Sequence, residues 1–362
     1  GYARSFGLVP EEGGFVLLTS VRGEPDRIPD YVPQPRLLAT MREYAAWTEE
    51  IGMADTGSVN EFIVQGRTDD LIQIAEARHT RFFVEAATQV ADLPEEGRLV
   101  LIAGPSSSGK TSSAKRLMVQ LRVLGLQPFA MSLDDYFVDR ENTPRDAAGE
   151  LYFEALEALR YDLVNEHLQA LMAGEEVHLP KFDFRTGKAE FAGEPTRLKR
   201  GQPLIVEGIH ALNPALTPAI PARDKLLVYV SALCHLNISR SSYIKTTHSR
   251  LFRRIVRDAQ FRGYTASETL ARWPGVRRGE EKHIFPHQNN ADLFFNSGLT
   301  YEMAVLKLWA EPRLAAVEAD DPHFGLARTL IDLLSLLLPI DARQVPPTSL
   351  LREFIGDSGF TY

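Results

Sequence analysis

Continuous apolar segments alternate with amphipathic segments over most of this chain. Short apolar runs bounded by polar or turn-forming residues occur at 99–103, 128–133, 204–206, 226–230 and 291–295. They lack the alternation of a half-exposed strand, which is typical of a parallel sheet covered on both faces. Apolar positions at helical spacing predict helices at 111–124, 153–173, 238–261, 301–310 and 324–338. The pattern predicts an α/β fold with a parallel sheet flanked by helices.

The first 95 residues have a different character. Four prolines lie between positions 25 and 35, and helical patterns follow at 37–52 and 69–90. A turn-rich stretch, Leu93-Pro94-Glu95-Glu96-Gly97, precedes the first apolar run. We therefore expect a small, mostly helical amino-terminal region over 1–95 and a larger domain over 96–362.

The first apolar run leads into Gly104-Pro105-Ser106-Ser107-Ser108-Gly109-Lys110-Thr111. This segment fits the phosphate-loop pattern G-x-x-x-x-G-K-[ST] and stands between a predicted strand and a predicted helix. The glycines allow positive φ, so backbone N–H groups can turn inward, and the helix directs its positive end at the anion. Lys110 can reach the β- and γ-phosphates, and Thr111 can offer a hydroxyl to Mg²⁺. The sequence predicts a P-loop fold that binds ATP through Gly104, Ser106, Ser107, Ser108, Gly109, Lys110, Thr111 and Ser112.

Composition and charge agree with a globular enzyme. The 362 residues are 44% hydrophobic and 24% charged, and the net charge of −8 disfavours a general nucleic-acid binder. No apolar run approaches the roughly 20 residues of a membrane helix, and no signal-peptide pattern opens the chain. The single cysteine, Cys234, excludes an internal disulfide and suits a reducing cytoplasm. We expect Cys234 to be a small buried residue and the protein to be cytoplasmic.

Carboxylates follow two of the predicted strands. Asp134 and Asp135 end the second run, where a carboxylate beside the phosphate loop can deprotonate an attacking hydroxyl or hold Mg²⁺. Adjacent residues of an extended segment point to opposite sides, so we expect only Asp134 in this role and Asp135 in a turn. Glu207 follows the third run and can serve the metal, while Gly208 permits a close backbone approach.

Four arginines share one face of a predicted helix. Arg250, Arg253, Arg254 and Arg257 lie at i, i+3, i+4 and i+7, and they repel each other unless anions meet them. Arginine binds phosphate oxygens bidentately, so we expect a lid over about 250–285 that closes on the triphosphate. The alternative is a solvated basic face.

Two aromatic residues stand in a predicted loop. Phe182 and Phe184 are able to enclose a flat ring between them, and they are equally compatible with an ordinary hydrophobic core.

These motifs, in this order, resemble the uridine/cytidine kinase group of P-loop kinases, with phosphoribulokinase and bacterial pantothenate kinase as cousins. The resemblance covers about residues 97–362. Its anchors besides the phosphate loop are the segments 133–137, 153–157, 181–184, 206–210 and 253–258. The chain most resembles a bacterial subgroup in which this domain follows a region related to threonyl-tRNA synthetase accessory domains. That resemblance implies that residues 1–95 are the tail of a larger amino-terminal part.

The resemblance also implies roles for single residues. Asp134 matches the carboxylate that activates a nucleoside 5′-hydroxyl, and Glu154 matches an aspartate that holds the ribose hydroxyls. Phe182 matches a tyrosine that touches the base, and Gly187 stands where these kinases carry a base-reading histidine. Both polar base contacts are therefore missing here, which weakens discrimination between bases. The histidine at position 210 makes this segment similar to phosphoribulokinase, so a sugar or a sugar phosphate remains an alternative acceptor.

Together these features predict a kinase that uses ATP and Mg²⁺ to phosphorylate a hydroxyl of a nucleoside-like acceptor. The alternatives are a kinase for another sugar or polyol, and a regulatory NTP-binding protein without catalysis. We expect a small-molecule acceptor as the partner and no association with a membrane. Assembly into a homo-oligomer remains an alternative. The predicted catalytic residues are Asp134, Lys110, Arg254 and Arg257, and Arg253 is expected at the nucleotide. The predicted acceptor residues are Asp134, Tyr136, Glu154, Phe182, Phe184 and Arg262. The predicted metal ligands are Thr111, Glu207 and Asp134.

Overall fold

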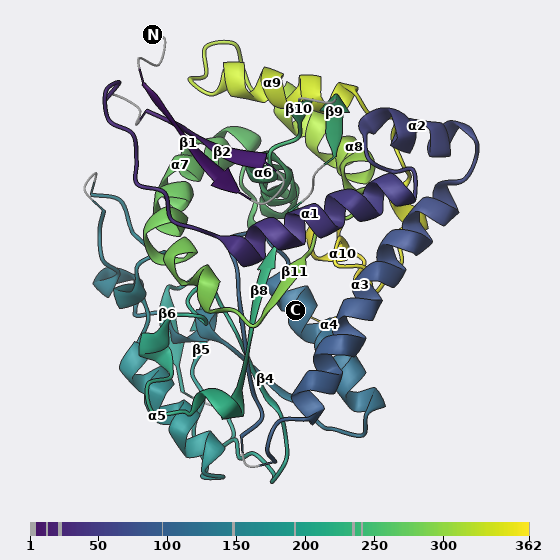
Figure 1. The fold of residues 1–362 in the computed structure, drawn as a ribbon. Coiled ribbons are helices and arrows are strands. Elements are labelled where there is room, and N and C mark those ends of the chain that lie inside the picture. Colours follow the sequence, from purple (N-terminus) through teal and green to yellow (C-terminus); the bar gives the residue numbers. More distant parts are fainter. Residues whose placement is uncertain are drawn as a thin grey trace. The chain divides into compact units, whose positions relative to one another are not determined.

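A computed structural model gives the conformation of the chain (Figure 1). It describes residues 5–11, 14–20, 24–95, 97–146, 149–191, 193–233, 236–239 and 242–361, so Cys234 lies outside the described residues. The chain divides into two compact units, Gly1–Ala39 and Thr40–Tyr362. The division near residue 95 expected from the sequence stays a prediction.

The first unit contains a β-hairpin that the apolar pattern did not predict. Strand β1 (Phe6–Glu11) pairs antiparallel with β2 (Gly14–Thr19), and Leu8 lies opposite Leu17. Large apolar side chains on one face of this hairpin are exposed.

A five-stranded parallel sheet forms the centre of the second unit. Its strands are β3 (Leu99–Ala103), β4 (Phe129–Ser132), β7 (Leu204–Glu207), β8 (Lys225–Ser231) and β11 (Leu293–Asn296). Their order is β11-β8-β3-β7-β4, and Leu99 in the central strand pairs with Leu204 on one side and Lys225 on the other. Parallel strands end at the same edge, so the segments after β3, β4 and β7 meet there. This sheet confirms the predicted P-loop type of α/β fold.

The apolar runs serve two cores, one on each face of the sheet. Along β3, Val100 and Ile102 belong to one core, whereas Leu99, Leu101 and Ala103 belong to the other. Successive side chains of a strand point to opposite faces, so a strand buried on both faces is apolar throughout. Helices α3 (Thr68–Ala91), α4 (Lys110–Val123), α6 (Thr246–Arg257) and α8 (Glu302–Ala315) contribute to the first core, and α5 (Tyr161–Met172) contributes to the second.

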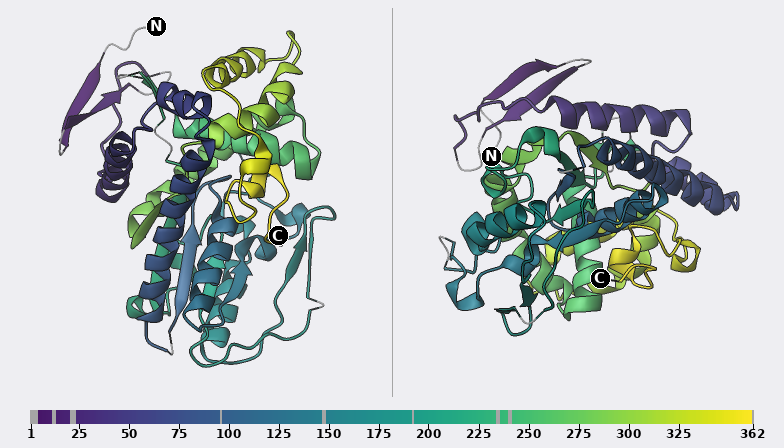
Figure 2. Two further views of the ribbon diagram at one scale, coloured as in Figure 1. Left: turned by 90° about the vertical axis from the view of Figure 1, so that its right-hand side faces the viewer. Right: turned by 90° about the horizontal axis from the view of Figure 1, so that it is seen from below.

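The helices correspond to the predicted ones except for several boundaries and three helices that were not predicted. They are α1 (Pro35–Glu50), α2 (Thr56–Val64), α3 (Thr68–Ala91), α4 (Lys110–Val123), α5 (Tyr161–Met172), α6 (Thr246–Arg257), α7 (Ala266–His283), α8 (Glu302–Ala315), α9 (Phe324–Ser335) and α10 (Arg352–Ile355). Figure 2 shows α3 alongside α4, and the two helices contact each other along the sheet. None of the described helices is long and apolar enough to cross a membrane.

Two predicted helices begin later than expected. Residues 153–160 form turns that include a 3₁₀ turn at Leu156–Ala158, so α5 starts at Tyr161. The short strands β9 (Asn237–Ser239) and β10 (Ser242–Tyr243) occupy part of this predicted helix, so α6 starts at Thr246. Strands β5 (Lys181–Asp183) and β6 (Lys188–Glu190) pair antiparallel and form another small hairpin.

The helices α2, α7 and α10 were not predicted. The polar stretch after Gly263 is helix α7, which a capping box between Thr265 and Glu268 opens and which contains Pro274. The sequence predicted this segment only as a polar stretch within an Arg-rich helical lid over about 250–285.

Candidate active site

The phosphate loop connects the central strand β3 to helix α4. A Cβ on Gly104 would lie 2.0 Å from the backbone oxygen of Val230 in β8, so only glycine fits this close approach. Gly109 has φ +89° directly before the helix, and Ser107 has φ 58°. Residues with positive φ turn the backbone N–H groups of such a loop toward a common centre. The loop therefore has the form that its glycines predict.

Helices α6 and α7 hold the start of this loop through one buried ion pair. Arg250 of α6 and Glu280 of α7 form two contacts, at 2.5 and 2.8 Å, and both side chains are almost fully buried. Glu280 also accepts the N–H of Ser106 at 3.0 Å, while Arg250 donates to the Ser106 oxygen at 3.1 Å. The peptide groups on both sides of Ser106 are therefore held between two opposite charges.

Arg253 holds the middle of the loop in a similar way. Its guanidinium pairs with Glu302 at the start of α8, at 2.5 and 3.2 Å, and both side chains are completely buried. It also donates to the backbone oxygen of Ser108 at 3.3 Å and to that of Ser297 at 2.6 Å. Arg253 thus contacts the backbone that shapes the loop, and its expected contact with the nucleotide stays a prediction.

The remaining arginines of this region share a single carboxylate. Arg254 and Arg257 approach the buried Asp258 at 3.2 and 2.8 Å, and Arg262 approaches it at 3.6 Å. Burial and repulsion from Arg257 lower the pKa of Arg254, and the same causes lower the pKa of Arg262 to about 10. Arg254 also donates to the Ser106 hydroxyl at 3.0 Å, so this excess of positive charge lies beside the phosphate loop.

Oxygen ligands gather at the start of α4 and the end of β7. Glu207 is largely buried, and one of its oxygens lies 2.8 Å from the Ser132 hydroxyl and 3.4 Å from the Thr111 hydroxyl. Burial, together with the negative charge of Asp134, raises the pKa of Glu207 to about 7. Lys110 donates to the backbone oxygen of Pro105 at 3.3 Å, and its positive charge acts on both carboxylates.

The two aspartates after β4 have different surroundings. They lie in a 3₁₀ turn, Leu133–Tyr136, and not in the extended segment assumed from the sequence. Asp135 pairs with Lys181 at 3.2 Å and accepts the N–H of Phe182 at 3.3 Å. Asp134 is exposed to solvent, but the protein atoms around its carboxylate displace water and thereby raise its pKa. The positive charges of Lys110 and Arg262 oppose this rise. Gly208 lies against this turn, because a Cβ there would be 2.6 Å from Leu133.

The predicted acceptor residues divide into buried and accessible ones. Tyr136 is fully buried, and its hydroxyl lies 2.8 Å from Nδ1 of His167. Phe182 is buried, with its ring centre 5.1 Å from that of Phe184, which is 54% exposed. Phe182 therefore belongs to the core, whereas Phe184 is accessible.

Glu154 lies against helix α7. A Cβ on Gly279 would be 2.3 Å from the Glu154 Cβ. Burial raises the pKa of Glu154, which the positive charge of Arg254 partly opposes. This carboxylate thus faces the same arginine that contacts the phosphate loop.

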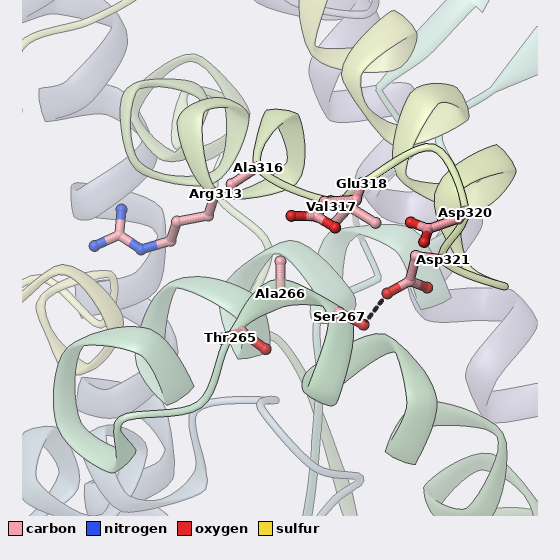
Figure 3. Close-up of a pocket in the computed structure, with 9 residues that line it drawn as sticks. All are labelled: Thr265, Ala266, Ser267, Arg313, Ala316, Val317, Glu318, Asp320 and Asp321. Atoms are coloured by element: carbon pink, nitrogen blue, oxygen red, sulfur yellow. Dashed lines mark hydrogen bonds between the residues drawn. The ribbon is translucent and has the colours of Figure 1, made fainter.

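Two hollows lie elsewhere on this unit. The first, of about 360 Å³, lies between the start of α7 and the segment joining α8 to α9, where Ser267 donates to Asp321 (Figure 3). The second, of about 440 Å³, is bordered by the end of α5 and residues 197–202. Neither contains a predicted site residue.

Sequence reasoning did not find the carboxylates that fix the arginines and the loop. Glu280 and Glu302 come from segments that follow the loop by many residues, and no motif marks them. A weak signal existed, because four arginines on one helix face require anions from elsewhere in the chain.

Comparison with known proteins gives the family. The model of the phosphoribulokinase / uridine kinase family matches residues 99–304. A uridine kinase from Chloroflexus aurantiacus is 27% identical over 218 residues, which are 59% of this chain and 94% of that protein. A uridine kinase from Deinococcus deserti is 27% identical over 213 residues, covering 59% and 93%.

Among solved structures, a possible uridine kinase from Bacillus stearothermophilus is 19% identical with a TM-score of 0.41, covering 59% of this chain and 98% of that one. The family match extends over more than half of the chain, from the central strand to helix α8. The matched segment includes the phosphate loop, Asp134 and Glu207 at the sheet edge, and the whole of helix α6. The chain therefore belongs to the phosphoribulokinase / uridine kinase family.

Proposed function

We propose that this protein is an ATP-dependent kinase that transfers the γ-phosphoryl group to a hydroxyl of a nucleoside-like acceptor. The observation that carries the proposal is the surroundings of Asp134. The positive charges of Lys110 in the phosphate loop, of Arg257 in α6 and of Arg262 in the following turn act on its carboxylate. An acceptor-activating carboxylate beside phosphate-binding cations is what phosphoryl transfer requires. A purely regulatory NTP-binding protein has no use for such a base.

The phosphate loop and its lysine bind the triphosphate in this proposal. The loop amides and the start of α4 receive the phosphates, and Lys110 places its charge on the β- and γ-phosphates. Arg254 and Arg257, which share the ion-pair partner Asp258 with Arg262, oppose the charge of the transferring group.

The residues around Glu207 fit a magnesium ion. Thr111, Glu207 and Asp134 offer only oxygen atoms, which Mg²⁺ prefers, and the surrounding protein raises the pKa values of both carboxylates. Among the described residues, no group of three or more His, Cys, Asp or Glu side chains would hold a metal unaided. Mg²⁺ commonly uses one or two carboxylates together with substrate phosphates and water. When bound, Mg²⁺ neutralises phosphate charge.

Asp134 acts as the general base. Its carboxylate accepts the proton of the acceptor hydroxyl, and the freed oxygen attacks the γ-phosphorus. The bond from that phosphorus to the bridging oxygen breaks, and ADP leaves with the electron pair. The raised pKa of Asp134 brings it closer to the pH at which such a base is effective.

A sugar or polyol acceptor is the second candidate. Gly187 has φ +73°, and a Cβ there would lie 2.7 Å from the Arg140 Cβ, so this position offers no side chain for reading a base. The expected role of Glu154 does not require a nucleobase in the acceptor, because a carboxylate can hold two neighbouring hydroxyls of ribose or of another polyol.

The test is consumption of ATP with nucleosides, their 2′-deoxy forms, sugars and polyols, using the wild type and two variants. Asp134→Asn should lower kcat by roughly 10²–10⁴-fold while ATP still binds. Lys110→Ala should abolish transfer and weaken ATP binding. Asp135→Asn is the matched control and should remain active. Unchanged turnover in Lys110→Ala would refute the kinase proposal, and a crippled Asp135→Asn with a mild Asp134→Asn would reverse the two roles.

Glu154 gives the test of the acceptor class. Glu154→Gln should raise the KM for the acceptor more than the KM for ATP, because its expected contact is with the acceptor hydroxyls. Activity on uridine and cytidine with little preference between them supports a nucleoside acceptor. Activity on sugars or polyols alone supports the second candidate.

A further inference from the structure

The carboxyl-terminal segment, residues 341–361, packs against the phosphate loop. A Cβ on Gly109 would lie 2.6 Å from the Leu350 side chain, so this segment touches the last loop glycine. The Phe354 ring lies 5.2 Å from the Arg253 guanidinium. Helix α10 (Arg352–Ile355) therefore stands beside the residues that shape the loop.

Glu353 of this segment binds the start of helix α4. Its carboxylate accepts from the Ser112 hydroxyl at 2.6 Å and from the Ser112 N–H at 3.3 Å. Ser112 is the third residue of α4 and is fully buried. N–H groups at this end of a phosphate-loop helix are donors for the nucleotide phosphates. A carboxylate of the chain itself thus uses donors that a phosphate requires.

The neighbouring residue holds Glu353 in place. Arg352 donates to the backbone oxygens of Ala342 at 2.8 Å and of Val345 at 2.6 Å, which fixes the start of α10 to the preceding turn. Glu353 also adds negative charge near Glu207, where the metal is expected. Repulsion between these two carboxylates makes the contact with Ser112 less favourable than an isolated one.

We propose that Glu353 is an internal competitor of the phosphate donor, bound to the start of α4 in the free protein and released when the nucleotide binds. This inference rests on the proposed function, because it requires that the loop bind a nucleoside triphosphate. Two anions cannot share the same N–H group, and they repel each other at one helix end. A protein whose competent form is only partly populated binds its ligand more weakly by that fraction.

The experiment measures binding of AMP-PNP with Mg²⁺ by calorimetry, without any acceptor. Glu353→Gln removes the charge, and Glu353→Ala removes the contact. Both should bind AMP-PNP roughly tenfold more tightly than the wild type, because a charge-assisted hydrogen bond no longer competes. The matched control is Asp357→Asn, because Asp357 lies in the same segment with its side chain 95% exposed. Its φ of 54° suits asparagine, and its binding should equal that of the wild type.

The outcomes separate this inference from the proposed function. Variants that bind AMP-PNP as tightly as the wild type, or more weakly, overturn the inference and leave the donor site standing. Weaker binding would assign Glu353 to the donor site itself. If the wild type binds AMP-PNP no better than Lys110→Ala, the donor site is wrong and the inference falls with it.

Discussion

The arginines of one short region have two different surroundings. Arg250 pairs with the buried Glu280, which also pairs with Arg277, and Arg253 pairs with the buried Glu302. Both arginines contact the backbone of the phosphate loop. Among the described residues, Arg254, Arg257 and Arg262 share Asp258 as their ion-pair partner. The first two are neutralised and act on the shape of the loop, whereas the other three leave positive charge without an equal partner. Helical spacing thus places arginines on one face but does not decide which of them meet a ligand.

The largest expected effect comes from the under-compensated arginines. Arg257→Ala and Arg254→Ala should each lower kcat by roughly 10³-fold, because an arginine at a transferring phosphoryl group is worth that much. The melting temperature should change little, since Asp258 keeps two partners in each variant. Arg81→Ala is the control, because Arg81 is an exposed arginine on α3. Steady-state kinetics equal to the wild type in both variants would assign these residues to a solvated basic face.

The paired arginines should instead affect stability. Arg253→Ala leaves Glu302 buried without its partner and should lower the free energy of unfolding by about 3–5 kcal/mol. Replacing both residues with apolar ones of similar size, Arg253→Met with Glu302→Leu, should lose less. Urea unfolding measures both, with Arg81→Ala again as the control. If Arg253→Ala is as stable as the wild type and loses only turnover, the two groups of arginines are not distinct.

Much of the fold follows from local sequence, and most of the site does not. The apolar strands were predicted within a few residues because burial on both faces leaves an unmistakable run, as in β3. Helix α7 was not, because Pro274, two glycines and many charges mask its pattern. The phosphate loop, Asp134 and Glu207 have a local signal at the ends of strands. Glu280, Glu302 and Glu353 become partners of the loop only through folding, and their spacing carries no information about this.

His210 provides a third case, a buried ionisable group without a counter-charge. Neither ring nitrogen makes a hydrogen bond of normal geometry, although the backbone oxygens of Ala155 and Glu154 slightly favour its protonated form. Burial and the nearby His283 and His287 lower its pKa to about 4. The unfolded chain takes up the proton near pH 6.5, so its contribution to stability is complete above that pH and is lost as the pH falls toward 4.

The smallest expected effect is therefore a pH dependence. Between pH 7 and pH 5 this histidine should remove up to about 2 kcal/mol from the free energy of unfolding. Since the pKa values of His283 and His287 are also lowered, the comparison is made with His210→Gln, in which only one of the three groups is gone. Urea unfolding at both pH values measures the difference. Equal losses in the wild type and the variant would show that His210 is not buried in its neutral form.

The position of strand β3 in the sheet has a consequence for synthesis of the protein. Both of its neighbours, β7 and β8, come about a hundred residues or more later in the chain, and the loop that follows β3 also needs Arg250, Glu280 and Glu302. A ribosome adds roughly 5–20 residues per second, so the strand waits many seconds for its partners. Until then it is an unpaired apolar segment. The interval between its appearance and its pairing is the time during which a nascent chain of this kind most needs protection from aggregation.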